Sequence, residues 1–269
     1  MLEKTAYLLV YHGSRDSRPH AEMGRLAQAV QQKLGEKSVA SRGRTEVMAT
    51  LTKSDWHAAP HSRVAMTEPS PPRVYTAALE LASLSLESAI ALLVQEHGLT
   101  NLQVIPLFLL PGVHVREDIP EAVEKAQQEA GNKVKISLCP YIGQSPLMMQ
   151  KLQNSFSDSE NSAKIIISHG SRRVGGNEPI ENLAQDLGGS AAYWSVSPSL
   201  SEQVERFVKA GVEKVEILPY FLFPGGITDA IAQQVQSLDT EFPRVPFHLG
   251  RPLCHCVSLA DVIIHEITV

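Results

Sequence analysis

Three short segments of the chain carry the side chains best suited to chemistry. His12-Gly13-Ser14 directly follows one apolar run, Glu80 ends a second, and His114 follows a Pro-Gly-Val turn after a third. Two imidazoles and a carboxylate bind a divalent metal ion weakly, leave coordination positions open, and accept protons near neutral pH. These residue types therefore indicate a labile metal site with proton acceptors. The alternative is a set of ordinary polar residues at strand ends, which any α/β protein has.

The elements that must position these residues are strands alternating with helices. Short apolar runs predict strands at 6–11, 74–79, 102–110 and 134–139, and in the second half at 165–168, 191–195, 215–223 and 247–249. Apolar positions three and four apart predict helices at 21–34, 84–97 and 119–130, and then at 180–187, 201–210 and 229–238. Nearly continuous apolar strands are buried on both faces, so each half is predicted to be an open, doubly wound α/β domain with a parallel sheet. Ligands of such sheets bind beyond the carboxyl ends of the strands, where His12, Glu80 and His114 are expected to converge.

The chain also contains an internal repeat. The motif His-Gly-Ser-Arg stands at 12–15 and again at 169–172, and Pro-Gly stands at 111–112 and again at 224–225. A third pair of similar segments lies between these matches, in the same order, at 84–90 and 198–204. Three ordered matches indicate a duplicated domain, because the period is too long for a solenoid.

The repeat predicts two homologous domains of unequal content. The first is expected to span 1–153 and to carry the active site, and the second, degenerate copy to span 162–269, with a polar linker between them. The halves differ mainly by an insertion at about 36–73, which is rich in proline and poor in periodicity. This insertion is expected either to close over an anionic ligand or to lie on the surface as a disordered loop, and the sequence favours the second.

The second copy lacks most of the candidate chemistry. His169 repeats His12, but we expect Trp194 in the place of Glu80 and Ile227 in the place of His114. A single active centre, belonging mainly to the first half, is the natural inference. The recurrence of the histidine motif favours a functional or ancestral role over a plain strand-to-helix turn.

Composition and charge exclude several classes of protein. The 269 residues carry a formal net charge of -5, which argues against a general nucleic-acid binder. No apolar run is long enough to span a membrane, and the N-terminus does not resemble a signal peptide, so a cytoplasmic globular protein is expected. The three cysteines form no disulfide framework. Cys254 and Cys256 are too close in sequence for a common thiolate site, so packing is favoured over a metal role.

The segments that carry His12, Glu80 and His114 resemble those of the class II chelatases of tetrapyrrole synthesis, and most closely those of the two-domain sirohydrochlorin chelatases of the CbiX/SirB kind. The resemblance rests on residues 11–16, 79–82 and 109–120, together with the degenerate second copy. It implies two chelatase-like α/β domains about a pseudo-twofold axis, with a cleft between them. It also implies insertion of Fe2+ or Co2+ into sirohydrochlorin, on the way to siroheme or cobalamin.

The resemblance further implies roles for individual residues. The metal-handling histidines of the family map onto His12 and His114, and its catalytic acidic residue onto Glu80. Metal insertion expels two pyrrole protons, so a proton acceptor and a labile metal ligand are both needed, and which histidine does which stays open. Because the substrate carries many carboxylates, the expected substrate-binding groups are Ser14, Arg15, Arg116, His169 and Ser171, with Arg172 and Arg173 as further candidates. For each arginine, a solvated surface charge is the alternative.

Three other classes of function fit less well. A non-catalytic carrier of metal or tetrapyrrole would use the same histidine pair and would differ only in lacking turnover. A nucleotide-using enzyme is disfavoured because neither GxGxxG nor GxxxxGK[ST] appears, and a serine hydrolase because Ser14 and Ser171 lie in no GxSxG elbow.

The remaining expectations concern metal choice, cofactor and assembly. Iron is favoured over cobalt because the chain has no His-rich tract, and the lack of a thiolate-rich tail argues against an iron–sulfur cluster or any other permanent cofactor. Cobalt and nickel stay open, since His/carboxylate sites accept all of these ions. A duplicated chain is expected to do as a monomer what a homodimer of single domains does.

Overall fold

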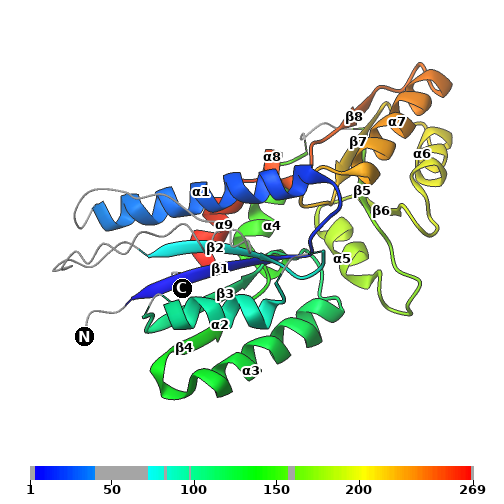
Figure 1. The fold of residues 1–269 in the computed structure, drawn as a ribbon. Coiled ribbons are helices and arrows are strands. Elements are labelled where there is room, and N and C mark those ends of the chain that lie inside the picture. Colours follow the sequence, from blue (N-terminus) through cyan, green and yellow to red (C-terminus); the bar gives the residue numbers. More distant parts are fainter. Residues whose placement is uncertain (1–3, 40–71, 82–83, 97, 157–160, 268–269) are drawn as a thin grey trace. The chain divides into compact units, whose positions relative to one another are not determined.

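The described chain forms two four-stranded parallel sheets. The computed structural model describes residues 4–39, 72–81, 84–96, 98–156 and 161–267 (Figure 1). The first sheet has the order β2-β1-β3-β4 and consists of β1 (Thr5–Tyr11), β2 (Arg73–Ala78), β3 (Asn101–Pro106) and β4 (Lys135–Leu138). The second has the order β6-β5-β7-β8 and consists of β5 (Ser162–Ser168), β6 (Ser190–Tyr193), β7 (Lys214–Pro219) and β8 (Phe247–Leu249). All pairs are parallel and both sheets have one topology, which confirms the predicted pair of doubly wound α/β units.

Helices connect the strands in both halves. The first half contributes α1 (Ser17–Val39), α2 (Leu86–Glu96), a π-helical turn (His114–Asp118), α3 (Ile119–Ala130), two short 3-10 turns (Gly131–Lys133 and Ile142–Gln144) and α4 (Pro146–Gln153). The second half contributes α5 (Glu178–Asp186), α6 (Leu200–Lys209), α7 (Gly226–Glu241), α8 (Leu253–Cys256) and α9 (Leu259–Glu266).

The first sheet is covered on both faces, as its apolar strands require. Ala6, Leu8 and Val10 alternate along β1 and pack into one core with the apolar faces of α2 and α3. The intervening Tyr7 and Leu9 are also buried, and α1 lies on the opposite face of the sheet from α2 and α3 (Figure 1). The strand ends are therefore held rigidly, which fixes where the candidate site residues emerge.

The second sheet has an equivalent core of its own. Ile165 and Ile167 of β5 are fully buried against Leu200 and Val204 of α6 and the buried face of α7. Nothing in this core distinguishes the second unit from the first in architecture. The difference between the halves therefore lies in the residues at the strand ends.

The last helix of each half belongs to the compact unit that the other half builds. One unit comprises residues 1–145 with 259–269, and the other comprises residues 146–258. Helix α9, at the end of the second half, packs against α1, where Lys33 Nζ lies 2.8 Å from Asp261 Oδ1. Helix α4, the last helix of the first half, belongs to the second unit. The spans 1–153 and 162–269 stay a prediction about the repeated halves. The bounds of the two compact units differ from these spans.

Several predicted boundaries differ from the structure for local reasons. The strands predicted at 102–110 and 215–223 end earlier, at Pro106 and Pro219. The residue after each proline still donates one bond to the central strand, from Leu107 N–H to the carbonyl of Val10 and from Tyr220 N–H to that of Ile167, and the chain then leaves the sheet. Helix α9 was not predicted, since five of its eight residues are buried and no amphipathic period shows. The short helices α4 and α8 were not predicted either, and α1 is longer than the predicted helix 21–34.

The predicted insertion falls largely outside the described residues. Helix α1 continues to Val39 and β2 begins at Arg73, so only the two ends of the segment 36–73 are described. The choice between a lid and a surface loop concerns residues 40–71, which lie outside the described part of the chain. Along the parts that are described, each helix is too short or too polar to span a lipid bilayer.

Candidate functional site

The candidate site lies at the switch point of the first sheet. In the order β2-β1-β3-β4 the chain winds one way from β1 and the other way from β3, and ligands of such sheets bind at the carboxyl ends of these two strands. His12 is the residue after β1, and His114 begins the π-helical turn reached by the loop that leaves β3. Glu80 follows the end of β2, the neighbour of β1. The predicted convergence of these three residues is therefore found in the structure.

The nitrogen and oxygen atoms of the three side chains are spaced as ligands around a single metal ion would be. Glu80 Oε2 lies 3.8 Å from His12 Nδ1, and Glu80 Oε1 lies 3.7 Å from His114 Nε2. The two imidazole rings meet edge to face, with centroids 5.0 Å apart and an interplanar angle of 82°. Two ligand atoms that each lie about 2.0–2.2 Å from one metal ion are at most about 4.4 Å apart. The observed separations are too long for hydrogen bonds and suit a divalent ion between the three groups.

Glu80 is positioned by backbone contacts with the histidine loop. Its N–H donates to the carbonyl of His12 at 2.9 Å, which extends the β1–β2 pairing beyond the strands. Gly13 has φ +94, and a Cβ atom at this residue would overlap the carbonyl oxygen of Glu80. Leu81, the residue after Glu80, has φ +58, a conformation that costs a non-glycine residue free energy. The backbone that carries Glu80 is therefore strained at Leu81, and at Gly13 it leaves no room for a side chain.

This close approach predicts a large effect of Gly13→Ala. We expect the free energy of unfolding to fall by about 1–3 kcal/mol because of the positive φ. We also expect weaker binding of Co2+, since Glu80 must move away from the new methyl group. Calorimetry and a Co2+ titration measure the two effects.

The matched control is Gly24→Ala. Gly24 lies in α1, where an added Cβ meets nothing within 4 Å, and alanine there raises helix propensity. Normal stability and Co2+ binding in Gly13→Ala would show that the turn does not set the position of Glu80.

The loop after β1 is fixed by the side chain of His20. The ring of His20 bridges Tyr11 Oη, at 2.6 Å from Nδ1, and the carbonyl of Ser14, at 2.7 Å from Nε2. Because a carbonyl only accepts, Nε2 carries the proton and Nδ1 accepts from the Tyr11 hydroxyl. Burial raises the pKa of Tyr11, so this hydroxyl keeps its proton. Hydrogen bonds from the Arg18 side chain and backbone lower the pKa of Asp16 to about 2 and stabilise the turn that follows.

One polar contact at the site was not predicted. Asp118 Oδ2 lies 2.6 Å from His114 Nδ1, on the side of the ring away from Glu80. The signal was present in the sequence, since residues four apart on a helix lie on one face. Because His114 and Asp118 both precede the predicted helix 119–130, this spacing did not enter the prediction.

The second half differs from the first at the equivalent positions, with one correction to the prediction. Ser195 N–H donates to the carbonyl of His169 at 2.9 Å, just as Glu80 N–H donates to that of His12. Ser195, and not Trp194, therefore stands in the place of Glu80, and the predicted alignment was wrong by one residue. Ile227, which follows Pro-Gly as His114 does, packs against the second core. The conclusion that this half has no carboxylate beside its histidine still holds.

The residues predicted to bind substrate are found at the strand ends of both sheets. Arg15 and Arg116 are exposed in the first unit, and His169 is exposed in the second. The hydroxyl oxygens of Ser14 and Ser171 accept the backbone N–H of the residue two positions later, at 3.0 and 3.1 Å. Each serine thus stabilises its own turn and still has a hydroxyl proton to donate. Their roles toward a substrate stay predictions.

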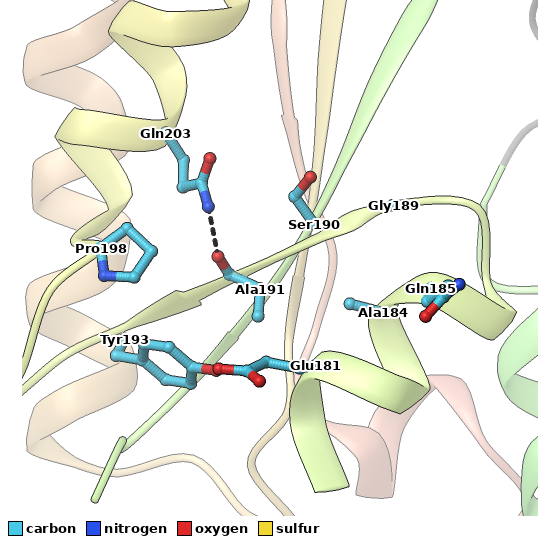
Figure 2. A pocket seen from close by; sticks show the side chains of 9 residues that line it. All are labelled: Glu181, Ala184, Gln185, Gly189, Ser190, Ala191, Tyr193, Pro198 and Gln203. Atoms are coloured by element: carbon cyan, nitrogen blue, oxygen red, sulfur yellow. Dashed lines mark hydrogen bonds between the residues drawn. The ribbon is translucent and has the colours of Figure 1, made fainter. Parts of the chain in front are cut away.

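The second unit also contains a pocket and the cysteines of α8. The pocket has a volume of about 270 Å³ and lies between α5, β6 and α6 (Figure 2). In it Gln203 Nε2 donates to the carbonyl of Ala191 and Tyr193 Oη donates to Glu181, so these polar groups already have partners. The cysteines of α8 form no disulfide, and Cys256 Sγ contacts the carbonyl of Arg251. Packing remains the interpretation for both thiols.

The fold and the cluster together define the class to which this chain belongs. It is a duplicated α/β protein with a candidate metal site of two histidines and a glutamate at the switch point of its first sheet. A family model described as CbiX matches residues 52–159 and again residues 163–268, once in each half. The chain belongs to the CbiX family.

Individual relatives agree with this assignment. A sirohydrochlorin ferrochelatase of Priestia megaterium is 26% identical over 70% of this chain and 74% of the relative. A sirohydrochlorin cobaltochelatase of the same organism is 27% identical over 57% of this chain and 55% of the relative. Among solved structures, SirB from Bacillus subtilis with Fe3+ superimposes with a TM-score of 0.66 at 20% identity, covering 98% of this chain and 94% of SirB. That likeness shows the shared fold.

Proposed function

We propose that this protein is a sirohydrochlorin chelatase, a lyase that inserts a divalent metal ion into the macrocycle, with Fe2+ as the favoured metal. The observation that carries the proposal is the open cluster of His12, Glu80 and His114 at the switch point of a CbiX-family sheet. Relatives named for iron and for cobalt insertion support the reaction class.

The exposure of the cluster suits a site that must release its metal. The side chains of His12 and Glu80 are 55% and 52% exposed, and that of His114 is 28% exposed. Three ligands leave coordination positions open for the pyrrole nitrogens, and water at the rim keeps the ion exchangeable. A fully closed four-ligand site would retain the ion instead. In this proposal His12 and His114 hold the incoming metal.

The same cluster accepts the protons that metal insertion expels. Glu80 lies between the two imidazoles, at 3.8 Å from one ring and 3.7 Å from the other. A proton that reaches either ring therefore has a carboxylate beside it, which makes Glu80 the group best placed to pass protons to solvent. Binding the macrocycle in a distorted form would expose its nitrogen lone pairs.

The carboxylates of the substrate need cationic and hydrogen-bonding partners. We assign Ser14, Arg15 and Arg116 of the first unit and His169 and Ser171 of the second to this role, because none is buried. Arg116 lies in the same π-helical turn as His114, and the other four lie in the segments that follow β1 or β5 directly. We further propose that the protein acts as a cytoplasmic monomer without a permanent cofactor or nucleic-acid or membrane partner.

An anaerobic absorbance assay tests the proposed function. Sirohydrochlorin is mixed with catalytic amounts of protein and with Fe2+, Co2+ or Ni2+ in turn, and the metallated product is followed over many turnovers. We expect the largest acceleration over the protein-free rate with Fe2+. A faster reaction with Co2+ would indicate a cobaltochelatase, and stoichiometric binding without turnover would indicate a carrier. The variant lacking both His12 and His114 is the control for catalysis by exposed surface groups.

A further inference from the structure

The first half has one extra residue just where its second histidine stands. Gly112 corresponds to Gly225, since each closes the loop after a strand that ends in a matched proline. Further on, the buried position Ile119 of α3 corresponds to Ile231 of α7, and the same spacing then aligns the next buried pairs, Val123 with Val235 and Ala126 with Leu238. The segment from Gly112 to Ile119 is therefore one residue longer than the segment from Gly225 to Ile231.

The extra residue is accommodated as a π-helical turn. The N–H of Ile119 donates to the carbonyl of His114, five residues earlier, whereas α7 is an ordinary α-helix from Gly226 onward. One-residue insertions of this kind are frequent at functional sites, because they shift the side chains of one turn against the rest of the helix. Here the turn begins at His114 and ends at Asp118.

The contact made within this turn determines which nitrogen of His114 carries the proton. Asp118 Oδ2 is 2.6 Å from Nδ1, and an ionised carboxylate only accepts, so Nδ1 carries the proton. In the neutral ring Nε2 then keeps its lone pair, and Nε2 is the atom that lies 3.7 Å from Glu80. The ring of Phe108, with its centroid 6.0 Å away, limits tilting of the imidazole.

We propose that Asp118 is a positioning residue that holds His114 in the Nδ1–H tautomer and directs Nε2 at the incoming metal ion. The second half supports this pairing, because it has Ile227 where His114 stands and, counting back from the pair Ile119 and Ile231, Ala230 at the position aligned with Asp118. Histidine and carboxylate are thus absent together. The link between Asp118 and metal insertion rests on the proposed function, but the tautomer of His114 and the affinity for Co2+ do not.

Three variants test the proposal in the full-length protein. Asp118→Ala removes the acceptor, Asp118→Asn keeps an acceptor oxygen, and Glu117→Ala removes a neighbouring exposed carboxylate from the same turn as the matched control. The first readout needs no metal: nitrogen-15 NMR of the His114 ring, assigned by its loss in His114→Gln. We expect a protonated Nδ1 in the parent protein, Asp118→Asn and Glu117→Ala, and its loss in Asp118→Ala.

The second readout is binding of Co2+ in the absence of any tetrapyrrole. We expect Asp118→Ala to weaken it by about tenfold, the lower end of the range for groups that orient a metal-binding histidine, because this site is partly exposed. Asp118→Asn should recover most of the affinity and Glu117→Ala should retain all of it. Thermal unfolding of each variant separates this effect from a loss of fold, and Asp118→Asn remains informative if the alanine variant does not fold.

Each possible outcome decides the proposal. An unchanged tautomer or an unchanged Co2+ affinity in Asp118→Ala would overturn it, and so would an equal loss in Glu117→Ala, which would indicate a general charge effect. If both readouts respond as expected but the parent protein does not metallate sirohydrochlorin, the proposed function fails and the role of Asp118 stands.

Discussion

We expect that replacing either His12 or His114 with alanine lowers the rate of metal insertion at saturating metal by at least about tenfold, since the proposed function gives each histidine a role as metal ligand or proton acceptor. Thermal unfolding should stay close to that of the parent protein, because neither side chain belongs to the buried core. We expect the double variant to show only the protein-free rate. Steady-state kinetics with sirohydrochlorin and Fe2+, beside calorimetry of each variant, measure these effects.

His169→Ala is the matched comparison, because it removes the same histidine from the same His-Gly-Ser-Arg motif in the other half. We expect a modest loss, mostly in affinity for the macrocycle, since Ser195 and Ile227 stand where His12 has Glu80 and His114 as neighbours. An equal collapse of kcat in His169→Ala and His12→Ala, at unchanged stability, would mean that both halves supply the catalytic centre.

Ending the chain after Ser258 is expected to unfold the first unit, although the missing residues follow the second half in sequence. Helix α9 buries Leu259, Val262, Ile263 and Ile264. At about 1.5–3 kcal/mol for each large apolar side chain, their loss removes about 6–12 kcal/mol. That is comparable with the whole stability of a typical domain, about 5–15 kcal/mol. Hydrogen exchange measured separately for the strands of each sheet shows which unit responds.

Two point variants in α9 test the same role without shortening the chain. Ile263→Ala, at a fully buried position, should cost about 2–5 kcal/mol. His265→Ala, on the exposed side of the same helix, should cost little. Loss of protection in β5–β8 rather than in β1–β4 would show that α9 stabilises the second half, as the span 162–269 predicted from the repeat implies.

Much of the candidate site was predictable because it depends on local rules. Apolar runs identified all eight strands, two of them too long at the carboxyl end, and parallel strands separated by helices put their carboxyl ends at one edge of the sheet. His12, Glu80 and His114 each follow such a run, so their convergence needed no knowledge of side-chain packing. The same rules failed where strands end, since the apolar run 102–110 continues past Pro106, the last residue of the strand.

The sequence by itself thus determined the duplicated α/β architecture and the strand ends that bring His12, Glu80 and His114 together. Only the tertiary structure decided which compact unit α9 joins, that Ser195 replaces Glu80, and that Asp118 contacts His114. The physical reason is the separation along the chain of the residues that determine each feature. Strand and helix periodicities are set by neighbours a few residues away, and they are readable along the chain. The partner of a buried helix and the register of a turn depend on packing between distant segments, where one inserted residue changes which side chains meet.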